Sequence, residues 1–472
     1  MNNDLGSTHS DANQDEIQAA FEALQNLREI PQQIDSPEAL EAMERELRKE
    51  ADKLIALLLQ KHLQENLDSE EQLTKEAELI KSWPGRMKNE GFGAVWIYTM
   101  SGLLIQVNVR YYRRSCDRRN GKRYKGVYAG LVLLGIHERC TPFLGATLSM
   151  WSSLLSSFAE VKQVLKDYNI DLGLKVIRRL TYRYAERARV MQQLGAFSLE
   201  EGETVSGRKV VVSCDGGRIR IRENKRGRKT VKGRTRFKGA WREPKLLIIY
   251  VVNQEGKLEK SFPAIIDASL DGPDGIFHLI YNYLKAIAIN TADKVLFVAD
   301  GAHWIWNRVP TLMKKLGLKS EQVHELLDFY HAVEHLGKVA GLCKSWSTKK
   351  RRAWIKKQRK QLLKGQTKQV ISAVQLICKG RNGKAMTVER DYFIRNQHRM
   401  AYSILKALNL PLGSGAVESA IRRVVNLRLK GPCIFWNREN ATKMLMLRSY
   451  YKAGRWNMLK RMANSPQTAF SE

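Results

Sequence analysis

Residues 295–304 read Val-Leu-Phe-Val-Ala-Asp-Gly-Ala-His-Trp, a short apolar run that ends in an acid followed by glycine. Such a run predicts a buried β-strand, with Asp300 at its carboxyl end. Residues 209–217, Lys-Val-Val-Val-Ser-Cys-Asp-Gly-Gly, repeat this arrangement around Asp215. Ligands of α/β proteins bind at the carboxyl ends of strands, and glycine allows a close approach there. Both aspartates are therefore predicted to face a ligand.

The order of elements around these strands predicts the fold class. Three strands come first, over residues 209–214, 246–252 and 258–267. A helix, a strand, a helix, a strand and a helix follow, over residues 273–288, 295–299, 302–316, 323–328 and 331–342. This β-β-β-α-β-α-β-α order is that of a ribonuclease H-like domain, an α/β fold with a mixed five-stranded sheet.

A third acid, Glu418, lies in the sequence Pro411-Leu-Gly-Ser-Gly-Ala-Val-Glu-Ser, ahead of a basic helix. Carboxylates gathered at one edge of a sheet bind hard divalent cations, since Mg²⁺ prefers oxygen ligands. We therefore predict a metal site formed by Asp215, Asp300 and Glu418, with Mg²⁺ or alternatively Mn²⁺ as the cofactor. The alternative for Glu418 is a purely structural role, because an acid at the amino end of a helix interacts favourably with the helix dipole.

The charge distribution predicts a polyanionic partner. The 472 residues include 80 Lys and Arg against 48 Asp and Glu, a net charge of +32. Residues 1–80 carry 19 acids and 7 bases, so the rest of the chain has a net charge of +44. A basic body of this size most often binds nucleic acid. An anionic membrane surface is the weaker alternative, since no basic amphipathic helix with a clean apolar face stands out. The longest apolar runs, residues 54–59 and 129–136, are far shorter than the ~18–20 residues of a membrane span, so no membrane partner is expected.

Composition and pattern divide the chain into five segments. They are an acidic helical region at 1–82, a basic β-ribbon with DNA-binding helices at 83–200, the first part of the ribonuclease H-like core at 201–343, a basic helical insertion at 344–407, and the last core helix with the C-terminal tail at 408–472. A helix over residues 40–58 carries leucines on one face. This helix either packs on its own protein or forms a dimer.

Two features of the second segment suggest DNA recognition. Apolar residues alternate over residues 105–111, which predicts a strand with one buried face, and Asn-Gly within residues 119–122 predicts a hairpin turn. Residues 157–190 resemble a helix-turn-helix whose second helix carries Arg178 and Arg179. The alternative is an ordinary helical hairpin with a solvated basic face.

One short motif points to a different chemistry. The sequence His331-Ala-Val-Glu-His335 matches the His-x-x-Glu-His pattern of some zinc peptidases. No distal third ligand is evident, and a peptidase gives no reason for the basic charge. We therefore expect this motif to lie beside the acidic site. The six cysteines form no Cys-x-x-Cys pair, so reduced thiols are expected.

The motifs together resemble those of prokaryotic insertion-sequence DDE transposases related to the Mutator superfamily. The matching elements are strand–Asp–Gly–Gly, strand–Asp–Gly–Ala–x–Trp, Asp-Phe-Tyr-His and Gly-Ser-Gly-x-Val-Glu-Ser, within roughly residues 90–450. The resemblance implies that Asp215, Asp300 and Glu418 hold the catalytic metals. It also implies that Asp328 and His331, in the third element, support the site.

The resemblance implies a DNA transposase that cuts and joins phosphodiesters of an insertion sequence. Its expected partners are terminal inverted repeats, target DNA and further copies of the chain, in a dimer or larger assembly in the bacterial cytoplasm at the nucleoid. Two alternatives are a structure-selective nuclease without strand transfer and a transposase-derived protein that only binds DNA. The basic residues expected to contact DNA are Arg178, Arg179, Arg218, Arg220, Arg222, Arg226, Arg228, Lys229, Arg422, Arg423, Arg428 and Lys430.

Overall fold

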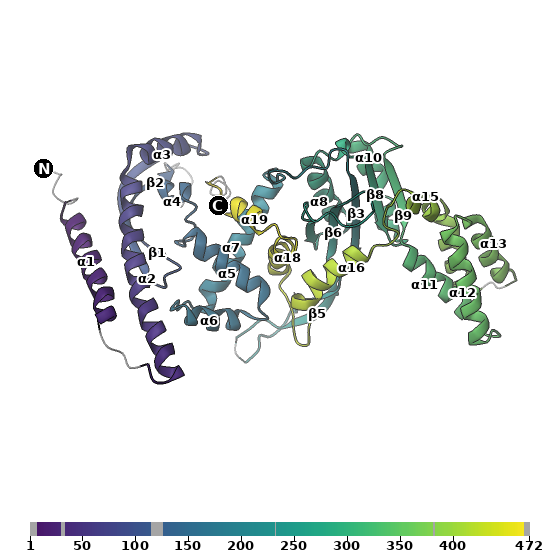
Figure 1. Cartoon of the computed structure of the whole chain (residues 1–472), viewed down its shortest axis with the longest axis horizontal. Helices are drawn as coiled ribbons and strands as arrows, with labels where there is room; N and C mark the ends of the chain where they lie inside the picture. Colours follow the sequence, from purple (N-terminus) through teal and green to yellow (C-terminus); the bar gives the residue numbers. More distant parts are fainter. Residues whose placement is uncertain (1–6, 30–33, 115–125, 232, 381–382, 467–472) are drawn as a thin grey trace. The chain divides into compact units, whose positions relative to one another are not determined.

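The computed structural model describes residues 7–29, 34–114, 126–231, 233–380 and 383–466. The chain forms two compact units, which we describe separately (Figure 1). The N-terminal unit comprises residues 1–194 and 459–472, and the sheet unit comprises residues 195–458. Among the described residues, no helix combines the length and apolar character needed to cross a membrane.

Helices begin the N-terminal unit, and serines define where two of them start. Ser36 accepts a hydrogen bond from the Ala39 N–H at the start of α2, and Ser69 accepts one from the Gln72 N–H at the start of α3. These caps satisfy N–H groups that have no partner within the helix. The elements of this unit are α1 (Ser7–Glu29), α2 (Pro37–Asp68), α3 (Glu70–Ser82), β1 (Met87–Tyr98), β2 (Leu104–Arg114), α4 (Ala129–Leu133), α5 (Pro142–Leu154), α6 (Phe158–Asp167) and α7 (Leu174–Gln193).

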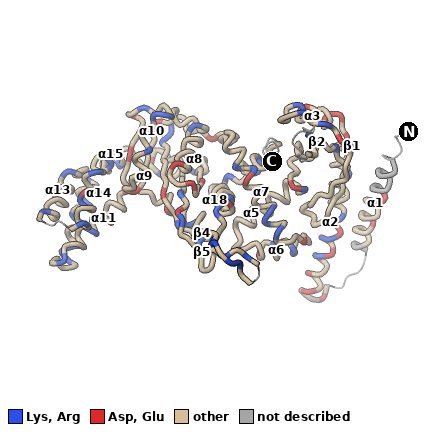
Figure 2. Tube along the Cα trace, turned by 180° about the vertical axis from the view of Figure 1, so that it is seen from behind, with Lys and Arg blue, Asp and Glu red and all other residues tan. Residues whose placement is uncertain are grey.

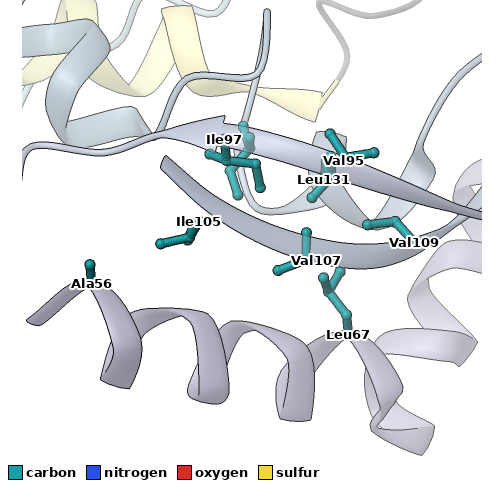
Figure 3. Close-up of a cluster of buried hydrophobic side chains, with 9 residues drawn as sticks. Ala56, Leu67, Val95, Ile97, Ile105, Val107, Val109 and Leu131 are labelled. Carbon is teal, nitrogen blue, oxygen red and sulfur yellow. The ribbon is translucent and has the colours of Figure 1, made fainter. Parts of the chain in front are cut away.

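The antiparallel pair β1 and β2 packs one face on α2 and α4 (Figure 3). The alternation predicted within residues 105–111 is confirmed for residues 105–109, where every second side chain is buried. The two strands are connected through residues 99–103, and the turn predicted at residues 119–122 lies outside the described residues. The buried cluster consists of Ala56, Leu67, Val95, Ile97, Ile105, Val107, Val109, Leu131 and Ile136.

Leu459 and the described residues after it belong to the N-terminal unit. Leu459 and Ala463 are fully buried, so this end of the chain supplies apolar surface to the unit. The Nε–H of Arg187, in α7, donates to the Ala463 carbonyl at 2.9 Å. The basic composition of α7 is therefore partly a packing feature, since Arg187 is buried rather than solvated.

A mixed five-stranded sheet forms the centre of the sheet unit, with the strand order β7-β6-β3-β8-β9. The pairs β7–β6 and β6–β3 are antiparallel, and β3–β8 and β8–β9 are parallel. The predicted mixed five-stranded α/β sheet is thus confirmed. Its strands are β3 (Lys209–Gly216), β6 (Lys245–Val252), β7 (Ile265–Ser269), β8 (Lys294–Ala299) and β9 (Val323–Leu327). Between β3 and β6 in the sequence, β4 (Ile219–Asn224) pairs with β5 (Phe237–Arg242) as a separate antiparallel hairpin.

Two predicted elements of the sheet unit differ from the structure. The third strand begins at Ile265 instead of residue 258, and Leu258 forms only an isolated bridge with Val252. The helix predicted over residues 302–316 is two helices, α9 (His303–Trp306) and α10 (Val309–Lys315). Pro310 lies at the start of α10, where a missing N–H is tolerated. A proline cannot continue a preceding helix, because it lacks the N–H that would donate to that helix.

The remaining helices follow the predicted order, including a helical segment ahead of Glu418. This helical segment lies between β9 and the helix of Glu418 in the sequence (Figure 1). These helices are α8 (Gly272–Ala286), α11 (Phe329–Gly341), α12 (Thr348–Leu363), α13 (Thr367–Cys378), α14 (Lys384–Arg395), α15 (Tyr402–Ala407), α16 (Gly415–Ile421), a π-helical turn (Arg422–Asn426), α17 (Leu427–Leu429), α18 (Arg438–Lys452) and α19 (Trp456–Asn464), with 3₁₀ turns at Ile289–Thr291 and Gln397–Arg399.

Candidate metal centre and nucleic-acid surface

Asp215, Asp300 and Asp328 occupy equivalent register positions at the carboxyl ends of three neighbouring strands. The parallel pairing of β3 and β8 matches Ser213 with Val298, so Asp215 and Asp300 stand at equivalent positions two residues further on. The pairing of β8 and β9 ends at Ala299, and the Asp328 N–H donates to the Ala299 carbonyl at 2.8 Å. Since the three strands are parallel neighbours, their carboxyl ends place these aspartates side by side.

Asp215 and Asp300 each use one carboxylate oxygen locally. The Gly216 N–H donates to Asp215 Oδ1 at 2.6 Å, and the Ala302 N–H donates to Asp300 Oδ1 at 3.0 Å. The Trp306 Nε1–H donates to the Asp300 carbonyl at 2.6 Å, which holds the turn after β8. Within the described chain no hydrogen bond reaches Oδ2 of either aspartate. The Oδ2 atom of Asp215 and that of Asp300 therefore remain available to a ligand.

Asp328 has a different environment, because its whole carboxylate is occupied by protein donors. The N–H groups of Tyr330 and His331 donate to its Oδ1 at 2.6 and 3.0 Å, which caps α11. Both the N–H and the hydroxyl of Ser414 donate to its Oδ2. Asp328 is fully buried and joins the start of α11 to the start of α16, the helix that carries Glu418.

Gly413 allows a close approach of the Tyr330 ring beside this junction. A Cβ atom at Gly413 would lie 2.7 Å from the ring of Tyr330, closer than side-chain packing permits. The Gly-Ser-Gly sequence before Glu418 therefore has a packing reason at Gly413 and a hydrogen-bonding reason at Ser414. Both contacts position the helix that presents Glu418.

His331 lies between Glu334 and Glu418. Its Nε2 is 3.8 Å from Glu418 Oε1, and its Nδ1 is 3.5 Å from Glu334 Oε2. Ligand atoms of Asp328, His331 and Glu418 lie within 4.8 Å of one another, a spacing that could hold a metal ion. Asp328 and His331 are residues that the sequence analysis expected to support the site, and Asp215 and Asp300 lie outside this group of three.

Electrostatics nevertheless link Asp215 to the same site. Burial raises the pKa of Asp215 above its ordinary value, and the N–H of Gly216 opposes that change. The carboxylates of Asp300 and Glu418 raise this pKa further, and His331 lowers it. These four ionisable groups are thus close enough to influence one another. Like charges that converge in this way are stabilised by a cation.

The donor set fits a divalent cation at this edge. Free carboxylate oxygens on Asp215, Asp300 and Glu418 suit Mg²⁺, which prefers oxygen ligands. The His331 nitrogen suits Mn²⁺ or another transition metal better than Mg²⁺. Asp328 already accepts four hydrogen bonds, so its role in holding protein segments together leaves it little capacity as a ligand.

The peptidase-like motif does not form a pair of histidine ligands. His335 Nδ1 is 2.6 Å from Glu389 Oε2, and its ring stacks on the ring of Tyr392 at 3.6 Å between centroids. Both partners lie in α14. His335 therefore points to the helical insertion, whereas His331 faces Glu418.

Tyr392 is a residue of the site region that the sequence analysis missed. A Cβ atom at Gly301 would lie 2.3 Å from the Tyr392 ring, so the glycine after Asp300 allows this ring to approach. The Tyr392 hydroxyl is buried and accepts or donates no hydrogen bond within the described residues. Burial and the carboxylates of Asp300 and Asp328 raise its pKa. Only the Gly301 signal was visible in the sequence, because Tyr392 lies in a distant helix.

The basic residues predicted to contact DNA differ in their exposure. Those around the β4–β5 hairpin, where Figure 2 shows a concentration of Lys and Arg, are mostly exposed. In the N-terminal unit Arg178 is exposed and Arg179 pairs with Glu138 at 3.3 Å. The exposed members of the predicted set are Arg178, Arg179, Arg218, Arg222, Arg226, Arg228, Lys229, Arg422 and Lys430.

Three members of the predicted set are buried or partly buried. Arg428 is 6% exposed and its guanidinium lies 5.3 Å from the centre of the Trp436 ring, so we remove it from the DNA-contacting set. Arg220 is partly buried and donates to the Gly431 carbonyl. Arg423 is also partly buried, and it donates to the Lys452 carbonyl at 3.3 Å.

No family model matches this chain, and no curated protein matches it either.

Proposed function

We propose that this protein is a DNA transposase of the DDE type, which cleaves and joins phosphodiesters with the help of divalent metal ions. The observation that carries this proposal is the convergence of Asp215, Asp300, His331 and Glu418 at the carboxyl edge of three parallel strands. Acidic sites of this composition perform phosphoryl transfer, because they hold the cations that neutralise the reacting phosphate.

A ribonuclease H-like identity of the sheet unit is part of this proposal. Three strands in antiparallel order followed by alternating helices and strands, with the strand order β7-β6-β3-β8-β9, support it. Asp215 lies at the carboxyl end of β3 and Asp300 directly follows β8, which are parallel neighbours in the sheet. The helical insertion α12–α15 precedes the helix that carries Glu418, as expected for this class of enzyme.

Each protein group has a distinct role in the proposed reaction. Asp215, Asp300 and Glu418 hold the metal ions, and His331 offers a nitrogen beside Glu418. Mg²⁺ or Mn²⁺ bound there would activate the attacking oxygen and stabilise the leaving oxygen of a phosphodiester. Asp328 positions His331 and Glu418 by joining the starts of α11 and α16.

The substrate in this proposal is the DNA of an insertion sequence. The net charge of +32 and the exposed basic residues after Asp215 support binding to a polyanion. The terminal inverted repeats and the target DNA would be brought together by two or more copies of the chain, acting at the nucleoid in the cytoplasm. The oligomer follows from the reaction, since two transposon ends must be joined to one target.

A strand-transfer assay tests the proposal. Purified protein is incubated with Mg²⁺, a DNA fragment carrying the ends of its own element, and a supercoiled target. Asp300→Asn is assayed beside Asp293→Asn, which changes an exposed acid at the opposite end of β8. Joined product from the wild type and the control, with none from Asp300→Asn, supports the proposal.

Other outcomes would redirect the assignment. Metal-dependent cleavage without joining would identify a nuclease. Binding without any cleavage, in Mg²⁺ or Mn²⁺ and equal for the wild type and Asp300→Asn, would indicate a protein that only binds DNA.

A further inference from the structure

The outward face of the β4–β5 hairpin carries an uninterrupted row of arginine and aromatic side chains, which we call the Arg–aromatic ladder. In spatial order its members are Arg218, Trp241, Arg220, Phe435, Phe237 and Arg222. Each neighbouring pair is in contact distance, with guanidinium-to-ring distances of 4.5–5.6 Å and 5.4 Å between the two phenyl rings.

The strand register explains why these side chains share a face. Arg220 is paired with Trp241, and Arg222 is paired with Gly239, so alternate residues point to the same side. Phe435 reaches this side across Gly239, where a Cβ atom would lie 2.4 Å from its ring. The absence of a side chain at Gly239 therefore makes room for the third ring of the ladder.

The opposite face of the hairpin is anchored to the sheet unit. Ile219 and Ile221 are buried, and Ile221 forms a β-bridge with Trp436. Trp241 and Phe237 on the outward face are 49% and 41% exposed. The hairpin thus packs through one face and exposes large aromatic rings between arginines on the other. Exposed apolar surface of this kind indicates a binding site.

We propose that the Arg–aromatic ladder binds unpaired nucleobases of the DNA strand that enters the acidic site. This inference rests on the proposed function, and it adds the form of the substrate. Exposed rings stack on bases of any sequence, and the arginines between them can bind the phosphates or stack as well. The ladder begins at Arg218, three residues after Asp215, so a strand lying on it leads to the carboxylates.

The charge around the ladder favours a nucleic acid over an apolar partner. The loop that connects β4 to β5 includes Arg226, Arg228 and Lys229, all of which are exposed. A duplex would present only its phosphates to such a surface, because its bases are stacked inside. Bases become available where the strands are separated or end in a single-stranded extension.

A binding experiment without divalent cations tests the ladder. Fluorescence anisotropy measures the affinity for two labelled DNAs with equal numbers of phosphates, a blunt duplex and a duplex with a single-stranded extension. Trp241→Ala should weaken binding of the extended DNA about tenfold, since the ring that stacks on a base is removed. It should leave the blunt duplex within about twofold, because no charge is lost.

Two further variants control the result. Phe143→Ala removes an aromatic side chain of 68% exposure from α5, a helix without charged residues, and should change neither affinity. Trp241→Phe keeps a ring and should recover most of the loss. Equal losses of Trp241→Ala on both DNAs would mean that the rings only orient arginines toward phosphates, and no loss on either DNA would mean that the ladder is not a nucleic-acid surface. Both results overturn the proposal.

The outcome is separable from that of the proposed function. Selective loss of binding in Trp241→Ala, in a protein that never joins DNA, would support the ladder and reject the transposase. Strand transfer by the wild type, together with unchanged binding by Trp241→Ala, would reject the ladder alone.

Discussion

The sheet unit contains two groups of acids that differ in their neighbours: one acid pairs with an arginine, and the others lie beside further carboxylates. The side chain of Glu203 is 6% exposed and pairs with Arg455, whose Nη1–H donates to Glu203 Oε2 at 2.9 Å. Arg455 also donates to two backbone carbonyls and lies between two phenyl rings, so the pair is satisfied within the protein. Asp215 and Asp300 instead stand beside other carboxylates, which raise the pKa of Asp215, and His331 lowers it.

The difference separates acids that stabilise the fold from acids kept for a ligand. A satisfied buried ion pair loses stability when either partner is removed, because the other charge is left buried. A cluster of like charges costs stability in the absence of a cation, and such costs are typical of functional sites. Substitutions in the two groups should therefore have opposite effects on stability and activity.

The largest effect is expected for Asp300→Asn. It should reduce strand transfer by about 10⁴-fold, the scale seen when a central catalytic group is removed. The free energy of unfolding should stay unchanged or rise, since one of several converging negative charges is removed. Strand-transfer rates and denaturant unfolding without metal ions measure the two effects. A stability loss as large as that of an Arg455 variant would break the comparison.

Arg455→Met is expected to act through stability alone. It leaves the Glu203 carboxylate buried without its partner, which should lower the free energy of unfolding by about 3–5 kcal/mol. Denaturant unfolding followed by circular dichroism measures the loss. The double variant Arg455→Met with Glu203→Met should recover most of it, because the unpaired charge is gone. An unchanged stability in the single variant would show that this pair is not what neutralises Glu203.

Ser414→Ala tests Asp328, an acid that protein donors satisfy beside the acidic site. It removes one hydrogen bond to the buried carboxylate of Asp328, which should cost about 1.5–3 kcal/mol of stability. Strand transfer should also fall, since Ser414 anchors the helix that carries Glu418. Ser419→Ala, an exposed change on the same helix, serves as the control. Loss of stability with fully retained strand transfer would show that the junction does not position Glu418.

The smallest effect is expected for Tyr392→Phe. Tyr392 is 6% exposed and its hydroxyl has no partner within the described residues, so removing that oxygen should raise the free energy of unfolding by about 1 kcal/mol. The ring that packs on Gly301 is kept. Thermal unfolding with and without Mg²⁺ measures the change. A stability loss would indicate that the hydroxyl is satisfied by water at the acidic edge.

Much of the fold could be predicted from local patterns. Apolar runs identified β3, β6 and β8, since a strand buried on both faces has no polar alternation, whereas the start of β7 was predicted seven residues too early. The same runs placed Asp215 and Asp300 at strand ends. The split between α9 and α10 was missed although Pro310 was visible, because the apolar spacing continued across it.

The candidate site was predictable only in part. Strand ends indicated Asp215 and Asp300, and the Gly-Ser-Gly sequence indicated the helix of Glu418. The saturation of Asp328 by Ser414 and by the start of α11 was not, because it joins segments far apart in the chain. Arg428 was assigned to the surface by its charge, but the structure buries it against Trp436.

Most strands, their order along the chain, the acids at their ends and the strong basic charge could be predicted from the amino-acid sequence, because each depends on neighbouring residues or on composition. Tertiary structure alone decided which polar groups are satisfied. It occupies all of Asp328, leaves oxygens of Asp215 and Asp300 available, and places Phe435 across Gly239 in the ladder. The physical reason is that hydrogen bonds and ring contacts between distant segments depend on how the elements pack, which no local periodicity encodes.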